Sequence, residues 1–298
     1  MGVHQEELER KVKRIQLFSR KTVMEILAGE YRSAFRGAGI DFEDIREYQF
    51  GDDVRNIDWN VTARTDAPHV KVFMEERELC VYFLLDVSGS MAFGGEGSGK
   101  RDAVANALAL LAFSATHNND KVGMVLFSDS IEFYARPGKT TNHVSAMVSA
   151  ALGFEPKSRD TDISAALEFI TKVKRSPAVV FLFSDFHSEG FDKRLRETAL
   201  RHDLICVEIN DPRELETPDA GMLELVDAET GRAAAVDCRS GKARDALRRE
   251  AERRHHRLSE LCMRSGADLL RISTEDDCLQ KIVSFLRARK ERGANAKA

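Results

Sequence analysis

Five oxygen-bearing side chains stand at the ends of predicted elements, where their atoms could meet around one ion. Asp86, Ser88 and Ser90 alternate along a single turn after an apolar run, Thr161 precedes a helical pattern, and Asp185 follows another apolar run. In open α/β sheets, ligands bind at the carboxyl ends of the strands. Carboxylate and hydroxyl oxygens suit Mg²⁺ or Mn²⁺ better than zinc or copper, which recruit His or Cys. The sequence therefore predicts a Mg²⁺ site, with Mn²⁺ or Ca²⁺ as alternatives.

The same residue types indicate what such an ion would do. Hydroxyl ligands are neutral, so the cation keeps more positive charge than it would in a cage made only of carboxylates. An open coordination position then attracts an anionic oxygen from outside, such as a Glu or Asp side chain of a partner protein. We therefore expect a protein-binding site and no catalytic residues.

From residue 79 onward, short runs rich in β-branched and aromatic residues alternate with helical patterns. Several runs are apolar nearly throughout, as in strands covered on both faces of a parallel sheet. The run 131–135 follows 122–127 after a tight turn, which indicates one antiparallel edge strand. The fold class is therefore α/β, with a doubly wound, mostly parallel sheet. Strands are predicted at 79–86, 122–127, 178–184, 203–209 and 267–272, and helices at 101–117, 141–152, 162–173, 193–201, 241–264 and 276–289.

The chain before residue 78 has a different pattern. Leu8, Val12, Ile15 and Phe18 form an amphipathic helical stripe, and the alternating stretches 30–35 and 70–76 favour strands. We expect residues 1–77 to form a helix and a small β-rich module, and residues 78–298 to form the α/β domain. Within that domain, 211–240 is expected to be a hairpin insertion that packs with the N-terminal module.

Composition excludes several other classes of protein. The 298 residues carry a formal net charge of −4, which disfavours nucleic-acid binding. No apolar stretch approaches the ~20 residues that span a bilayer, and no signal sequence opens the chain. The five cysteines are scattered without a CxxC pair, as in proteins of a reducing compartment. A cytoplasmic location without a membrane span is the expectation.

The motif Asp86-x-Ser88-x-Ser90, with Thr161 and Asp185 in this order of strands and helices, resembles the metal-ion-dependent adhesion site of von Willebrand factor A domains. In that family the site holds a divalent cation that binds a carboxylate of a protein ligand. The resemblance implies that these five residues are the metal ligands.

The string Gly-Asp-Asp-Val-Arg-Asn-Ile-Asp-Trp at 51–59 narrows the match. From about Gly29 to the C-terminus the chain resembles the bacterial domain-of-unknown-function fifty-eight family, von Willebrand A-like proteins commonly encoded beside MoxR-type AAA ATPases. The resemblance implies an adaptor or co-chaperone that acts with such an ATPase in the maturation or assembly of client proteins. The partner that offers the carboxylate would be the ATPase or its client.

The family string, taken with its flanking residues from Arg46 to Arg64, has two interpretations. Its charged and aromatic residues could form a docking surface or a second charged site, or they could form a buried ion-pair network with Ile57 and Trp59 in a core. The residues concerned are Arg46, Asp52, Asp53, Arg55, Asp58, Trp59 and Arg64.

Two other functions stay open. A metal-assisted hydrolase would need a base, and His187, two residues after Asp185, is the candidate. A structural assembly factor would have no functional metal. The string 94–100 resembles a phosphate-binding loop, but Arg101 replaces the hydroxyl that would hold Mg²⁺, so we interpret it as a loop before a helix.

Overall fold

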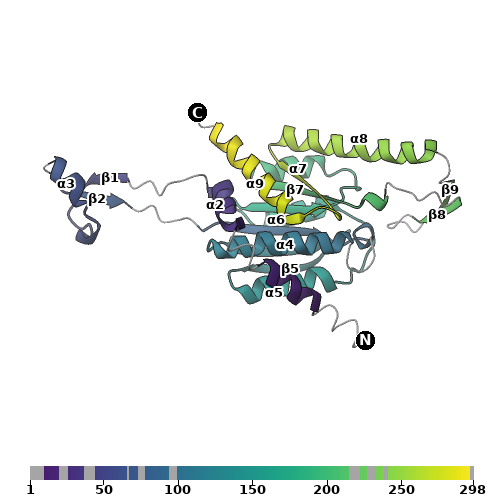
Figure 1. Ribbon diagram of the computed structural model, residues 1–298, viewed down its shortest axis with the longest axis horizontal. Helices are drawn as coiled ribbons and strands as arrows, with labels where there is room; N and C mark the ends of the chain where they lie inside the picture. The colour runs from purple at the N-terminus through teal and green to yellow at the C-terminus, as the bar shows by residue number, and fades with distance from the viewer. Residues whose placement is uncertain are drawn as a thin grey trace.

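The computed structural model describes residues 10–19, 26–36, 44–65, 67–72, 78–93, 99–214, 222–226, 233–237 and 241–295. A six-stranded sheet with the order β10-β7-β6-β3-β4-β5 forms its centre (Figure 1). Five strands are parallel, and β5 pairs antiparallel with β4 at one edge. The predicted fold class is confirmed. The strands are β3 (Cys80–Asp86), β4 (Lys121–Phe127), β5 (Ile131–Gly138), β6 (Val179–Ser184), β7 (Asp203–Asn210) and β10 (Asp268–Ser273).

Helices cover both faces of this sheet, so the domain has three layers. One face packs against α2 (Ala28–Arg36), α4 (Lys100–His117), α5 (Thr141–Gly153) and α9 (Cys278–Asn295). The other face packs against α6 (Ile163–Val173), α7 (Asp192–Ala199) and α8 (Gly241–Ser265). Residues 10–19 are also helical, with Val12 and Ile15 buried.

Burial on both faces explains the continuous apolar runs. Along β3, Val81, Phe83 and Leu85 pack on the α4 side, while Tyr82 and Leu84 pack on the α6 side. Successive side chains of a strand point to opposite faces, so each position meets a helix layer. A strand with no exposed face therefore has no place for the polar alternation of a surface strand.

Helix α2 replaces the strand that the sequence predicted at 30–35, so that prediction was wrong. Tyr31, Ala34 and Phe35 stand at helical spacing, and they pack against the core of the α/β domain. The Tyr31 hydroxyl donates to Oδ2 of the buried Asp120 at 3.2 Å, and the backbone N–H of Leu79 donates to Oδ1 of the same residue at 2.9 Å. The helix thus belongs to the main core and is joined to the start of β3.

Between α2 and β3 the chain forms a small unit. Strands β1 (Asp44–Glu47) and β2 (His69–Val72) pair antiparallel, with η2 (Val54–Asn56) and α3 (Trp59–Thr65) between them. Figure 1 shows this unit to one side of the six-stranded sheet. We refer to residues 44–72 as the projecting unit.

The segment after β7 forms a second hairpin. It begins with η4 (Pro212–Glu214) and continues with β8 (Met222–Val226) and β9 (Ala233–Asp237), which pair antiparallel. These strands form a sheet of their own, and Figure 1 places them at the opposite end of the molecule from β1 and β2.

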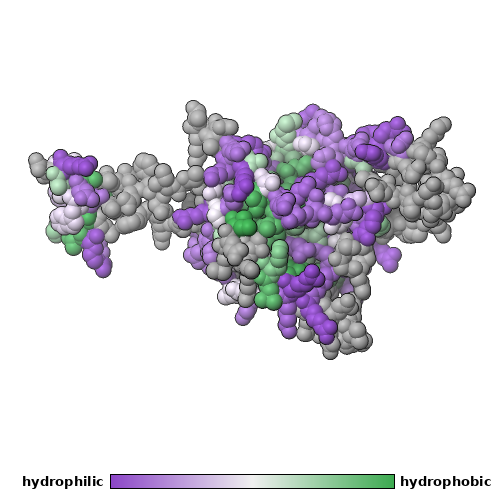
Figure 2. Space-filling model, viewed as in Figure 1, coloured by the Kyte–Doolittle hydropathy of each residue, from purple (hydrophilic) through white to green (hydrophobic). Residues whose placement is uncertain are grey.

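Helix α8 carries a charged outer face. Arg248 pairs with Glu252 and Arg253 with Glu250, each at 3.3 Å, while Leu258 is buried against the sheet layer. Figure 2 shows this helix as a hydrophilic surface. The arginine-rich outer face of α8 is therefore a solvated surface.

Within the described ranges, no helix has both the length and the apolar content needed to cross a bilayer.

The position of Gly123 in β4 has no room for a side chain between the neighbouring strands β3 and β5. A Cβ there would lie 2.8 Å from Cε1 of Tyr82 and 3.2 Å from the carbonyl oxygen of Ala135. Gly123→Ala should therefore lower the free energy of unfolding by about 1–3 kcal/mol, measured by urea denaturation. Gly29→Ala is the control, because it lies in α2 with nothing within 4 Å and should raise stability by about 0.4–1 kcal/mol. Equal effects of the two substitutions would contradict this account of β4.

Candidate functional site

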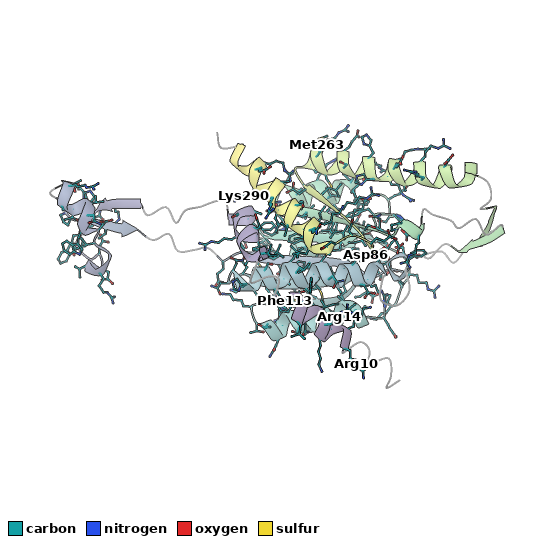
Figure 3. The ribbon with its side chains drawn as sticks, viewed as in Figure 1. Arg10, Arg14, Asp86, Phe113, Met263 and Lys290 are labelled. Atoms are coloured by element: carbon teal, nitrogen blue, oxygen red, sulfur yellow. The ribbon has the colours of Figure 1, made fainter. Side chains whose placement is uncertain are left out.

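Four of the five predicted ligands gather at the carboxyl edge of the sheet. Asp86 ends β3, and Asp185 directly follows the neighbouring strand β6. The Ser184 hydroxyl donates to Oδ2 of Asp86 at 2.7 Å and so joins the two strand ends. Figure 3 marks Asp86 toward the side of the domain from which β8 and β9 extend.

The turn after β3 brings both serines to these carboxylates. The backbone N–H of Ser88 donates to Oδ1 of Asp86 at 2.9 Å, and the hydroxyl oxygens of Ser88 and Ser90 lie 3.2 Å apart. The Ser90 hydroxyl is also one of the groups that lower the pKa of Asp185. All four residues are buried, with exposed fractions from 0% to 8%. Hard oxygen donors from two strand ends therefore converge in one buried cluster.

Thr161 lies on a loop that contacts this cluster through the backbone. The N–H of Gly89 donates to the carbonyl of Arg159 at 2.9 Å, which holds the loop before α6 against the turn after β3. Asp162 caps α6 by accepting from the N–H of Ala165 at 3.2 Å. Thr161 is half-buried at this junction, and its role as a ligand stays a prediction.

A lysine that sequence reasoning did not assign to the site lies beside it. Lys100 begins α4, and its side chain has no exposed surface. Its Nζ lies 2.9 Å from Oδ2 of Asp185 and also forms an ion pair with Glu214 in η4. The available signal was a single lysine at the end of the string 94–100, and that string favours a loop before a helix.

The two carboxylates of the site have opposite pKa shifts. Burial, together with the negative charge of Asp185, raises the pKa of Asp86 to about 7. Burial also acts to raise the pKa of Asp185, but the Lys100 ammonium, His187 and the Ser90 hydroxyl together outweigh burial and hold that pKa below its ordinary value. Asp185 is therefore paired with a lysine, whereas among the residues that the structure describes no basic side chain forms an ion pair with Asp86.

The donor set fits a hard divalent cation. It offers two carboxylates and two hydroxyls that are already desolvated and close together, the ligand chemistry of Mg²⁺. Within the described ranges, no group of three or more His, Cys, Asp or Glu residues is arranged to hold a metal. A cation in this cluster would thus depend on the serine hydroxyls as ligands. Its positive charge would also compensate the negative charge of the Asp86 carboxylate.

His187 lies close to the same cluster. Its Nδ1 is 3.8 Å from Oδ2 of Asp185, and about a third of its side chain is exposed. It is therefore placed to reach both the site and solvent.

The residues of the family string lie on the projecting unit and are largely exposed. Arg46 forms a bidentate pair with Asp52 at 2.7 and 2.8 Å, and Asp53 pairs with Arg55 at 2.7 Å. Trp59 is 70% exposed, so the interpretation that placed it in a core was wrong. Asp58 caps α3 by accepting from the N–H groups of Asn60 and Val61, and Arg64 is exposed near the end of α3.

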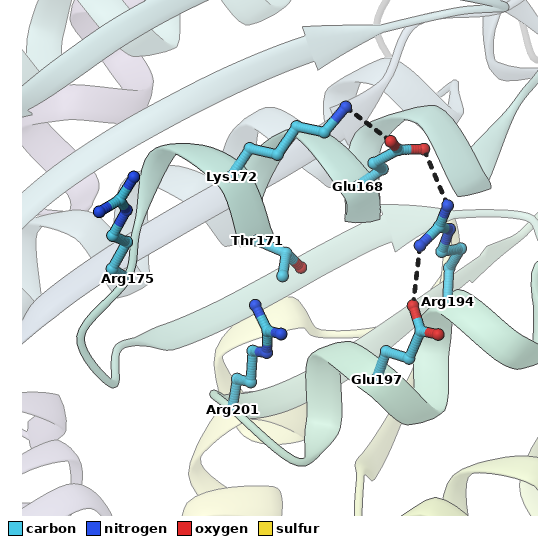
Figure 4. Close-up of a pocket in the computed structure, with 7 residues that line it drawn as sticks. All are labelled: Glu168, Thr171, Lys172, Arg175, Arg194, Glu197 and Arg201. Carbon is cyan, nitrogen blue, oxygen red and sulfur yellow. Dashed lines mark hydrogen bonds and ion pairs between the residues drawn. The ribbon is translucent and has the colours of Figure 1, made fainter.

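A surface groove of about 470 Å³ lies elsewhere, between α6 and α7 (Figure 4). Glu168 pairs with Lys172 at 2.6 Å and with Arg194 at 3.2 Å, and Arg194 also pairs with Glu197. The groove includes the end of α6, where the chain turns back to begin β6, so it faces the amino ends of the strands. It shares no residue with the cluster at Asp86.

Comparison with known proteins identifies the family of this chain. The model of the family described as "Protein of unknown function DUF58" matches residues 44–257. The chain belongs to this family. The DUF58 match includes the projecting unit, all five predicted ligands, Lys100 and Glu214.

Similar proteins occur in mycobacteria. The chain is 32% identical over 276 residues to Uncharacterized protein Mb1516 of Mycobacterium bovis and to Uncharacterized protein Rv1480 of Mycobacterium tuberculosis. Each alignment covers 91% of this chain and 86% of the relative.

Two solved structures also resemble this DUF58 protein. One is the conserved hypothetical protein BatB of Bacteroides thetaiotaomicron, with 14% identity and a TM-score of 0.45. The other is an aerotolerance-related membrane protein of Bacteroides fragilis, with 15% identity and a TM-score of 0.47. In both, the match covers 72% of this chain and 99% of the other chain.

Proposed function

We propose that this DUF58 protein is a non-catalytic, metal-dependent protein-binding module. The observation that supports it is the convergence of Asp86, Ser88, Ser90 and Asp185 in one buried cluster at the carboxyl edge of the sheet. Mg²⁺ is the proposed cation, with Mn²⁺ or Ca²⁺ as alternatives. When bound, the cation would supply a positive charge that attracts a carboxylate of a partner protein.

Each residue of the cluster has a distinct role in this proposal. Ser88 and Ser90 would offer neutral hydroxyl oxygens directly to the cation, and Thr161 would join them from the neighbouring loop. Asp86 and Asp185 would balance its charge. Ser184 and the backbone of Ser88 hold the Asp86 carboxylate in place, so the site is positioned before any ligand arrives.

The proposed partner is a MoxR-type AAA ATPase or a client of that ATPase, in the cytoplasm. Membership of the DUF58 family supports this through the resemblance described above. The projecting unit supports it as well, because Phe50, Val54 and Trp59 expose apolar surface beside the ion pairs of Arg46 and Arg55. Apolar residues rimmed by charges are typical of a docking surface.

Titration of Mg²⁺ or Mn²⁺ into the purified protein tests the site. We expect saturable binding that weakens by about tenfold or more in Asp86→Ala and Ser88→Ala, because each removes an oxygen donor or its counter-charge. Glu189→Ala is the control, since this exposed carboxylate lies near Asp185 and outside the donor set. Equal binding by wild type and both site variants, or no binding at all, would end the assignment.

A metal-assisted hydrolase is the second candidate, and the position of His187 near Asp185 favours it. It predicts turnover of generic phosphoesters by the metal-loaded protein, and this turnover should disappear in Asp185→Ala and in His187→Ala. Activity that depends on both residues would replace the binding function proposed above.

A further inference from the structure

The most unusual charge in the domain is the ammonium group of Lys100. Its side chain is fully buried, while the side chains of Asp185 and Glu214 are 3% and 22% exposed. Burying an ammonium group carries a large desolvation cost unless carboxylates compensate for it. Lys100 has two such partners, Asp185 directly after β6 and Glu214 in η4.

The pairing keeps Lys100 charged. Its Nζ lies 2.9 Å from Oδ2 of Asp185 and also forms an ion pair with Glu214, so two carboxylates stabilise the ammonium form. Three carboxyl groups, those of Asp86, Asp185 and Glu214, accompany this one ammonium group. The cluster thus holds an internal cation next to its oxygen donors.

Asp185 belongs to two arrangements at once. It is one of the two carboxylates of the proposed metal site, and its Oδ2 also accepts from the Lys100 ammonium at 2.9 Å. A divalent cation that engages Asp185 would meet the repulsion of an ammonium group on the same carboxylate. Glu214 in η4 forms a second ion pair with the same ammonium group, so it weakens the interaction between Lys100 and Asp185.

We infer that Lys100 and Glu214 are positioning residues that set the cation affinity of the Asp86 cluster. Lys100 competes with the metal for Asp185, and Glu214 draws the ammonium toward η4. Glu214 lies in η4, which precedes β8 and β9 in the chain. The inference rests on the proposed metal site and names two residues that set its affinity.

The test measures Mn²⁺ affinity in two single variants of the full chain. Lys100→Met removes the competing charge and should tighten Mn²⁺ binding by about tenfold or more. Glu214→Gln leaves the ammonium with Asp185 alone and should weaken Mn²⁺ binding by a similar factor. Lys193→Met, at an exposed lysine of α7, is the matched control and should leave the affinity unchanged. Opposite shifts distinguish this role from a structural one, because loss of structure would weaken binding in both variants.

A double variant protects the test against misfolding. Lys100→Met removes the ammonium group that pairs with Asp185 and Glu214 and can unfold the domain. Lys100→Met/Glu214→Gln removes one charge of each sign, and circular dichroism should show a native fold. This variant should bind Mn²⁺ more tightly than wild type, because the competing ammonium is absent.

The outcomes separate this inference from the proposed function. Wild-type binding with no change in the two single variants and the double variant would overturn the inference and leave the proposed function intact. Binding by Lys100→Met or the double variant, but not by wild type, would overturn metal dependence of the native protein and support Lys100 as a cation that takes the place of the metal. If the folded double variant and wild type both bind no Mn²⁺, the inference fails together with the site.

Discussion

Chelation should release the protein from its partner. When the tagged chain is isolated from native lysate, we expect a MoxR-type AAA ATPase or its client in the captured material, and at least about a tenfold loss of that material in EDTA. The reason is that the bound cation would provide the positive charge that holds the partner carboxylate. Quantitative mass spectrometry of the captured proteins measures the effect.

Two controls make the chelation result specific. Excess Mg²⁺ should restore capture by wild type, and it should not restore capture by Asp86→Ala. Capture that is the same with and without EDTA would favour the alternative of a structural assembly factor with no functional metal.

Removing the ring of Phe181 should cost about 3–5 kcal/mol of the free energy of unfolding. Phe181 is fully buried on the central strand β6, and its ring stacks on Phe83 with centroids 5.4 Å apart. Phe35 of α2 meets the same ring edge-on at 5.9 Å, so Phe181→Ala would open a cavity between the sheet and a helix. Urea denaturation followed by circular dichroism measures the loss.

Phe133→Ala is the matched control for this substitution. Phe133 lies on the edge strand β5 and is 40% exposed, so its loss should cost about 1 kcal/mol. Similar losses for the two phenylalanines would contradict the core described here.

The sheet could be predicted from the sequence because its strands are buried on both faces. Runs such as 79–86 and 178–184 have almost no polar residue, and the structure places β3 and β6 within one residue of them. The stretch 30–35 was misassigned because six residues show too little of either period. Tyr31 and Phe35 fit a strand face and a helix face equally well until their partners in α9 and the sheet are known.

The candidate site was predictable only in part. The alternation of Asp86, Ser88 and Ser90 is local, and the topology of parallel strands brings Asp185 to them. Lys100 and Glu214 have no such pattern, since Lys100 is 85 positions from Asp185 in sequence and meets it only through the packing of α4. Trp59 was misplaced because the projecting unit is too small to bury a large ring among its own residues.

Asp120 joins the two elements that flank the projecting unit in the sequence. Its carboxylate accepts from the Tyr31 hydroxyl in α2 and from the backbone N–H of Leu79 just before β3. A pull on residues 44–72 that separates α2 from β3 would therefore load these two hydrogen bonds, at the end of β3 farthest from Asp86.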